Sequence, residues 1–152
     1  MEATCVTHIG ICVSDMEKSL AFYRDILGMK VLGDRFTDPS ESGRTHNYHQ
    51  PRRTRRWVSL SYADGGTPTL TLTSHPGEKV EGRPILLDQI GISHLSFGVK
   101  DVKSLAQDLI TRGAELAGPL ESFANSRGEI RSIYVRDPDG ILVQFNTSDS
   151  GG

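Results

Sequence analysis

Two kinds of hydrophobic periodicity divide the chain into short strands and two helices. Apolar residues three and four positions apart predict one helix over 16–27 and a second over 102–112, and each is followed by a glycine that suits a helix end. Alternation of apolar and polar residues predicts half-buried strands between and beyond them. These strands lie near 8–13, 29–36, 56–62 and 68–74, and near 94–99, 115–123, 129–136 and 141–147.

The same pattern occurs twice. The segment 8–16 returns 86 residues later as 94–102, with a histidine, a valine and an aspartate at matching positions. Each copy begins with a strand, continues as a helix and is followed by three strands. An internal repeat of this kind indicates a duplicated supersecondary unit. We expect modules at approximately 4–75 and 90–148, joined by a linker over 76–89.

The predicted fold class is α+β. A chain of 152 residues is the size of one domain, here 1–152, made of two modules. Two βαβββ modules most simply bury two curved sheets around a shared cavity, with one helix packed behind each sheet. A tight hairpin turn is expected at 137–140, where the sequence reads Asp-Pro-Asp-Gly.

Each predicted strand has an apolar side and a side of small or polar residues, because side chains alternate between the two faces of a sheet. His8 shares its side with Gly10 and Cys12, and His94 occupies the equivalent place in the repeat. Small polar residues on a solvent face need no function. Two histidines at duplicated positions favour a shared site instead, because imidazole suits both metal binding and proton transfer near neutral pH.

The composition narrows the classes of partner. The formal net charge of −2 argues against a dedicated nucleic-acid-binding protein, which is usually basic. No apolar run approaches the length of a membrane span, and the N-terminus lacks the features of a signal peptide, so we expect a cytoplasmic protein.

Cys5 and Cys12 lie too far apart along one strand to form a disulfide, which predicts two free thiols with a structural role.

Three stretches resemble the vicinal oxygen chelate superfamily, which includes glyoxalase I, methylmalonyl-CoA epimerase, extradiol dioxygenases, and fosfomycin- and bleomycin-resistance proteins. They are 7–29, 94–101 and 134–145. The resemblance implies paired βαβββ modules in a half-open, cupped sheet, a homodimer, and metal ligands on the first and last strands of each module. Whether the cup forms within one chain or across two stays open.

Transferred by position, the ligands implied by this resemblance are His8, Thr71, His94 and Gln144. The superfamily usually has acidic or other strong donors where this chain has Thr71 and Gln144. We therefore expect a divalent ion (Zn, Ni, Co, Mn or Fe) on His8, His94 and Gln144, or direct polarisation of the substrate by these residues without metal. No organic cofactor is predicted.

Other side chains are candidates for contact with a substrate. Tyr134 is expected either to donate to a substrate oxygen or to be an ordinary, partly buried strand tyrosine, and Thr71 faces the predicted cup. Residues 37–54 form a long polar connection, interpreted as a lid or rim that contains His49. His49 either completes a site when this segment closes or is an ordinary surface histidine, and the surface position is the favoured interpretation. Arg56 belongs to a basic cluster beside Trp57, which is either a solvated strand edge or an anion contact.

The resemblance and the paired histidines predict a small-molecule enzyme of the lyase or isomerase type, acting on a substrate with adjacent oxygens. His8, His94 and Tyr134 are its expected catalytic residues. The alternative is a non-catalytic protein that binds a drug or metabolite, as bleomycin-resistance relatives do. A dioxygenase with ligands from the lid is a third possibility. No membrane partner is expected.

Overall fold

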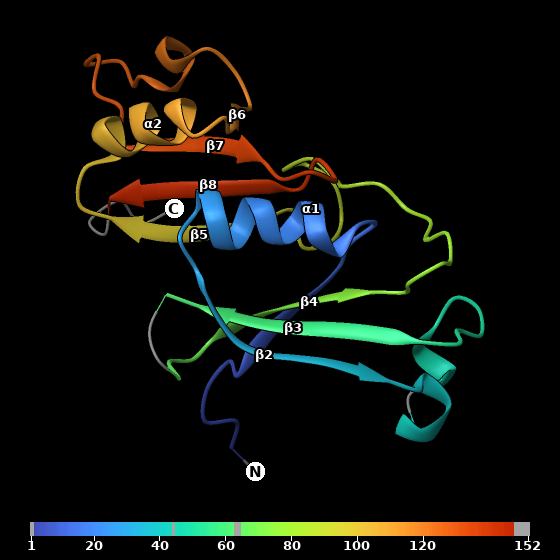
Figure 1. The fold of residues 1–152 in the computed structure, drawn as a ribbon. Coiled ribbons are helices and arrows are strands. Elements are labelled where there is room, and N and C mark those ends of the chain that lie inside the picture. The colour runs from blue at the N-terminus through green and yellow to red at the C-terminus, as the bar shows by residue number, and fades with distance from the viewer. Residues whose placement is uncertain (1, 44, 63–64, 148–152) are drawn as a thin grey trace. The chain divides into compact units, whose positions relative to one another are not determined.

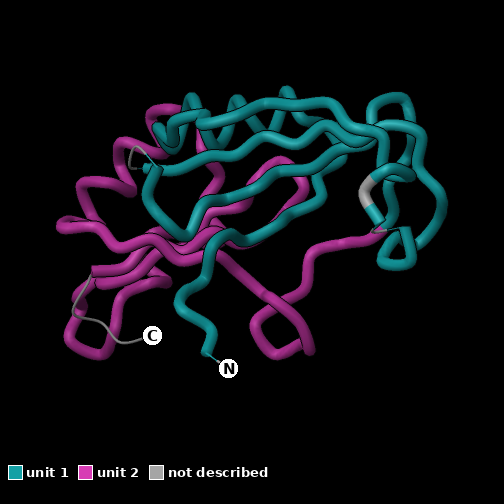
Figure 2. The backbone as a smooth tube through the Cα atoms, turned by 90° about the horizontal axis from the view of Figure 1, so that it is seen from below, with its two compact units in different colours: residues 1–81 teal, residues 82–152 magenta. Residues whose placement is uncertain are grey.

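The structure, a computed structural model, describes residues 2–43, 45–62 and 65–147. The chain forms two compact units, residues 1–81 and residues 82–152 (Figure 2). Both units contain one four-stranded mixed sheet, and each sheet carries a helix from its own unit. The α+β class and the two βαβββ modules predicted from the sequence are confirmed.

The first unit follows the order strand, helix, three strands (Figure 1). Its sheet has the order β1-β4-β3-β2, in which β1 runs parallel to β4 and the other pairs are antiparallel. A π-helical turn, Ala21–Ile26, continues α1, and two 3-10 turns separate β2 from β3. The elements are β1 (His8–Cys12), α1 (Met16–Leu20), β2 (Lys30–Thr37), β3 (Arg55–Ser61) and β4 (Thr69–Ser74).

The second unit repeats this topology. Its sheet has the order β5-β8-β7-β6, again with one parallel pair, β5 and β8. The predicted turn at 137–140 is confirmed by a hydrogen bond of 2.9 Å from the Gly140 N–H to the Asp137 carbonyl. The elements are β5 (His94–Val99), α2 (Val102–Thr111), β6 (Glu115–Leu116), β7 (Ser132–Arg136) and β8 (Leu142–Thr147).

Equivalent aspartates begin the two helices. The carboxylate of Asp15 accepts hydrogen bonds from the N–H groups of Glu17 and Lys18, at 3.0 and 3.2 Å, and that of Asp101 accepts one from Ser104 at 2.9 Å. These bonds satisfy N–H groups that have no partner within the helix. No helix in the described ranges is both long enough and apolar enough to cross a bilayer.

The apolar faces of both sheets are buried, as the alternation predicts. A side chain on one face of a central strand is covered by its helix, which removes its apolar surface from water. The buried apolar residues on this face are Val58, Leu60, Leu70 and Leu72 in the strands of the first unit, and Leu95, Ile133, Val135, Val143 and Phe145 in those of the second.

Two expectations are corrected here. The strand predicted over 115–123 ends at Leu116, and a 3-10 turn, Leu120–Phe123, follows Pro119. Proline has no N–H to donate to a sheet ladder, so it ends the strand early. Cys5 and Cys12 are free thiols, as expected, but both are exposed and neither is a buried packing residue.

Candidate active site

The polar face of the second sheet gathers most of the candidate residues of that unit. Strand pairing places Ser96, Gln144 and Tyr134 in one row across β5, β8 and β7. His94, Leu142 and Arg136 form the adjacent row. Paired residues share a face of the sheet, so all six side chains lie opposite the face that packs on α2.

His94 is held in a defined orientation. Its Nδ1 lies 2.8 Å from the Ser93 hydroxyl, and its ring meets that of Tyr134 edge to face, with the ring centroids 5.7 Å apart. The Nε2 atom has no partner among the described residues. A histidine fixed through one ring nitrogen presents the other to a ligand or proton. The sequence-predicted pair His94 and Tyr134 is therefore brought together.

Gln144 is fixed through its amide nitrogen. The Nε2 group donates a hydrogen bond of 2.8 Å to the hydroxyl of Ser132, on the neighbouring strand β7. Its carbonyl oxygen accepts no hydrogen bond within the described part of the chain. An amide oxygen with this freedom can accept from a substrate or coordinate a cation.

A cavity of about 320 Å³ adjoins this face. Tyr134 and Arg136 line it, together with apolar side chains from three segments of the second unit. The apolar lining comes mainly from Leu86, Leu87, Phe123 and Leu142. Its size and mixed lining are those of a small-molecule site.

The polar face of the first sheet carries the other predicted residues. His8 pairs with Thr69, and Thr71 lies beside Gly10 and Ser59. The Nδ1 of His8 lies 3.1 Å from the hydroxyl of Thr7. Thr7 and Ser93 are equivalent in the repeat, so among the described residues both histidines have the same arrangement of a preceding hydroxyl at Nδ1 and an unpartnered Nε2.

Arg56 lies on the opposite face from Trp57. Its guanidinium forms ion pairs with Glu17, on α1, and with Asp34, on β2, the latter at 2.8 Å. This pairing raises the pKa of Arg56 and lowers that of the Asp34 carboxyl. The charge of Arg56 is thus already neutralised on the helix side of the sheet, which leaves little for an anionic substrate.

Arg35 takes the place beside Trp57 that the sequence suggested for Arg56. It pairs with Trp57 across β2 and β3, and its guanidinium lies 5.3 Å from the centre of the indole ring. No carboxylate among the described residues forms an ion pair with it. The alternation along 29–36 assigns Arg35 to this face, so its position beside Trp57 is predictable from the sequence.

His49 belongs to the long connection between β2 and β3. Its Nε2 lies 3.8 Å from a carboxylate oxygen of Glu81, and its side chain is 81% exposed. Within the first unit it does not join His8 or Thr71. His75, which follows β4, is buried and shares a hydrogen bond of 2.9 Å between Nδ1 and the Thr54 carbonyl.

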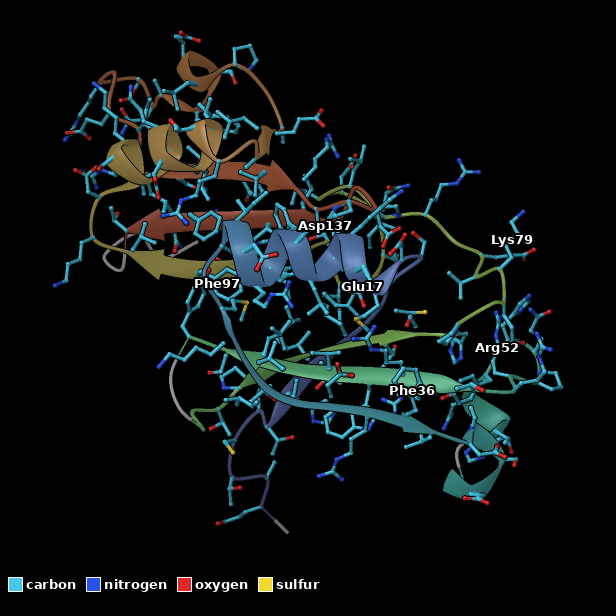
Figure 3. All side chains as sticks on the ribbon, in the orientation of Figure 1. Glu17, Phe36, Arg52, Lys79, Phe97 and Asp137 are labelled. Atoms are coloured by element: carbon cyan, nitrogen blue, oxygen red, sulfur yellow. The ribbon has the colours of Figure 1, made fainter. Side chains whose placement is uncertain are left out.

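A second cavity, of about 460 Å³, opens on the helix side of the first sheet. Glu17 and Phe36, from α1 and β2, are among its lining residues, and Figure 3 labels both. Arg56 and His75 also line it. The charged side chains of Glu17 and Arg56 form an ion pair here, so we assign the residues of this cavity a structural role.

The family model for the Glyoxalase/Bleomycin resistance protein/Dioxygenase superfamily matches residues 6–145. The chain belongs to this superfamily. The match covers both modules and every candidate residue named above. The resemblance inferred from the sequence is confirmed.

Several relatives of this superfamily are similar over nearly their whole length. A lactoylglutathione lyase of Haemophilus influenzae is 27% identical over 154 residues, which cover 97% of this chain and 96% of the relative. The metallothiol transferase FosB of Staphylococcus epidermidis is 27% identical over 97% of this chain and 84% of its own. The lyase and transferase activities are those of the two relatives.

Solved structures agree on the fold. The trypanothione-dependent glyoxalase I of Leishmania major has a TM-score of 0.67 and 26% identity, covering 95% of this chain and 87% of that one. A glyoxalase family protein from Bacillus cereus has a TM-score of 0.74 at 19% identity, covering 97% and 95%. The second likeness concerns the fold alone.

The resemblance to metal-dependent relatives implies a metal, and each unit taken by itself supplies donor atoms of a suitable type. His8 and His94 each offer Nε2, and Gln144 offers its carbonyl oxygen. Within each unit, the described residues include no group of three or more His, Cys, Asp or Glu side chains placed to hold an ion. A divalent ion on these donors would therefore keep its charge until an anionic ligand bound.

Arg136 is a functional candidate that sequence reasoning missed. Alternation along β7 places it on the same face as Ser132 and Tyr134, so the signal was present. The alternation does not predict the cavity, because two of the cavity walls come from segments predicted as a linker and as a strand. The position of Arg136 at a cavity therefore follows only from the folded structure.

Proposed function

We propose that this protein is a small-molecule enzyme of the lyase or isomerase type, acting on a substrate with two adjacent oxygens. The observation that carries the proposal is the arrangement around His94: an oriented imidazole with a free Nε2, in contact with Tyr134 and beside a cavity. The activities of the superfamily relatives support the same class.

The chemistry assigned to this site is a proton shift between two neighbouring carbons. In an adduct of a thiol with a 2-oxoaldehyde, the Nε2 of His94 takes the proton from the carbon that bears the hydroxyl. The bond electrons form a carbon–carbon double bond, and negative charge develops on the adjacent oxygen. Tyr134 donates a hydrogen bond to that oxygen. The protonated imidazole of His94 then returns its proton to the neighbouring carbon, while the hydroxyl proton passes to the charged oxygen and the carbon that lost its proton becomes the thioester carbonyl.

His8, Thr71 and Trp57 are proposed to contact the same substrate from the first module. This part of the proposal rests on the equivalent positions of His8 and His94 in the repeat. Gln144 is proposed to accept a hydrogen bond from the substrate hydroxyl through its free oxygen. Arg35 supplies the positive charge beside Trp57 in place of Arg56.

As an alternative to base catalysis by His94, we propose a divalent ion held by His8, His94 and Gln144. In that case the Nε2 atom of His94 would ligate the ion, and another side chain would take the substrate proton. When bound, such an ion polarises a substrate oxygen as a Lewis acid. Its presence is tested by elemental analysis of protein purified without chelator, followed by titration with Zn²⁺, Ni²⁺ or Co²⁺. We further propose a cytoplasmic homodimer, for which light scattering would give about twice the chain mass of 16.7 kDa.

The experiment for the main proposal is turnover of the hemithioacetal of methylglyoxal and glutathione, followed as thioester formation. We expect measurable turnover in the wild-type protein and its loss in His94→Ala. Ser104→Ala, at the cap of α2, is the matched control. Absence of turnover with this and with other 2-oxoaldehyde adducts would contradict the proposal.

A non-catalytic binding protein is the second candidate. It is favoured by Thr71 and Gln144, which put neutral side chains where the superfamily usually has stronger donors. In that case His94→Ala would weaken ligand affinity and no wild-type turnover would exist to lose. Calorimetry and turnover on the same two proteins distinguish the two functions.

A further inference from the structure

The cavity beside the polar face of the second sheet contains an arginine whose charge is not neutralised. Among the described residues, no carboxylate forms an ion pair with Arg136, and its one hydrogen bond is a long contact of 3.5 Å to the Gly140 carbonyl. By contrast, Arg56, Arg112 and Arg131 each pair with a carboxylate at 3.1 Å or closer. A half-buried guanidinium with spare donors is suited to an anion.

The rest of the cavity is largely apolar. Leu142 and Phe123 contribute walls from the sheet and from the turn after Pro119, and Leu86 and Leu87 contribute another. Both Leu86 and Leu87 are more than half exposed, so they remain open to a ligand. An occupant must therefore present apolar carbon to most of the surface and an anionic group to Arg136.

The wall formed by Leu86 and Leu87 is held in place by local contacts. The side-chain carbonyl of Gln89 accepts a hydrogen bond of 2.7 Å from the Leu86 N–H, and the Gln89 N–H donates to the Leu86 carbonyl at 3.2 Å. Pro84 packs close to Gly140, where a Cβ would lie 3.4 Å from its ring. The cavity is thus largely formed before a ligand arrives, which lowers the entropy lost on binding.

We propose that this cavity binds a carboxylate attached to a short apolar chain, with Arg136 as the residue that selects the anion. Its location beside His94 and Tyr134 makes it the anchoring site for one arm of the substrate. This anchoring role rests on the proposed function. Asp88 also lines the cavity, so its negative charge opposes the carboxylate and limits affinity.

The test is an NMR titration of the full chain with hexanoate, 1-hexanol and hexylammonium as probes. We expect hexanoate to bind at least about tenfold more tightly than the other two and to shift the amide signals of 86–88 and 134–142. Affinity should rise by about fourfold for each methylene from butyrate to hexanoate, because each is removed from water. Equal affinity for the three probes would overturn the proposal.

Variants separate the charge from the cavity. Arg136→Met should remove the preference for hexanoate over hexanol, and Arg136→Lys should retain part of it, because lysine keeps the charge without the forked donors. Asp88→Asn should strengthen hexanoate binding about twofold. Arg131→Met, at an exposed arginine paired with Glu129, should change nothing. An unchanged preference in a folded Arg136→Met protein contradicts the proposal.

The readout is independent of turnover. His94→Ala should retain hexanoate binding, because His94 does not line the cavity. Hexanoate binding without any turnover would therefore leave the anion site standing while the proposed enzyme function failed. Turnover without selective hexanoate binding would support the enzyme function and contradict the anion site.

Discussion

The polar faces of the two sheets have the same layout but differ in their chemistry. Each has a histidine on its first strand, with a preceding hydroxyl beside Nδ1. In the second unit, His94 is accompanied by Tyr134, Gln144 and an apolar cavity. In the first unit, His8 faces a row of threonines.

This difference shows which parts of the duplicated module were retained and which diverged. The strand order, the aspartate cap and the histidine with its hydroxyl are common to both copies. In the second copy the histidine is accompanied by Tyr134, Gln144 and the cavity with Arg136, whereas the first copy has Arg35 beside Trp57. We therefore expect the second face to dominate catalysis and the first to assist in binding.

The largest expected effect concerns the two histidines. His94→Ala should lower kcat/KM for the hemithioacetal by about 100-fold or more, because it removes the proposed general base. His8→Ala should lower the same kcat/KM less, by about tenfold. Steady-state kinetics on the two variants provide the comparison. A loss for His8→Ala that equals or exceeds that for His94→Ala would break the proposed division of roles.

Tyr134→Phe should lower kcat by about tenfold and change KM little, because the lost hydrogen bond acts on charge that develops in the transition state. The ring contact with His94 is retained in phenylalanine. Tyr48→Phe, in the connection between β2 and β3, is the control. If KM rises while kcat is unchanged, Tyr134 acts in substrate binding alone.

Gln144→Glu should raise the affinity for Zn²⁺ or Co²⁺ by about tenfold or more, because it adds a negative charge to a neutral donor set. Titration calorimetry measures this without reference to activity. Ser132→Ala removes the hydrogen-bond partner of Gln144 and adds no charge, so its metal affinity should stay within about twofold of wild type. Unchanged affinity in Gln144→Glu would remove this position from the proposed metal site.

The smallest expected effect is on stability, through the Arg56 network of the first unit. Arg56 lowers the pKa of Asp34, so the contribution of Asp34 to the free energy of unfolding is present above its unfolded pKa, about 4, and is lost as pH falls through the lower folded value. Asp34→Asn should destabilise the protein at pH 7 by less than about 1 kcal/mol.

Urea unfolding at pH 7 and pH 3 checks this sign. The difference between wild type and Asp34→Asn should shrink at pH 3. A difference that is the same at both pH values would show that the Asp34 carboxylate contributes nothing through its charge. The result tests the structural role of the Arg56–Asp34 ion pair.

Much of each module could be predicted from the sequence because the relevant signals are local or repeated. Period-two alternation assigns His94 and Tyr134 to one face, and the 86-residue offset pairs His94 with His8. The same alternation separates Arg56 from Trp57, since adjacent residues of a strand point to opposite faces. The basic residues that are clustered in the sequence therefore lie on different faces of the strand.

The remaining features depend on contacts between segments that are distant in sequence. Asp34 lies 22 residues from Arg56, and no local pattern predicts their ion pair. The cavity beside Arg136 needs Leu86 and Leu87, which have no periodicity of their own. Pro119 ends a strand that alternation alone would continue. These features follow from the packed chain and not from any one segment.

The central claim is that His8 and His94 act on one substrate. A crystal structure with a bound lactoylglutathione molecule measures this directly, through the distances from both Nε2 atoms to the ligand oxygens. We expect each Nε2 within about 3 to 4 Å of the same ligand, directly or through one shared ion. Imidazoles more than about 10 Å apart, with the ligand on only one of them, would contradict the claim.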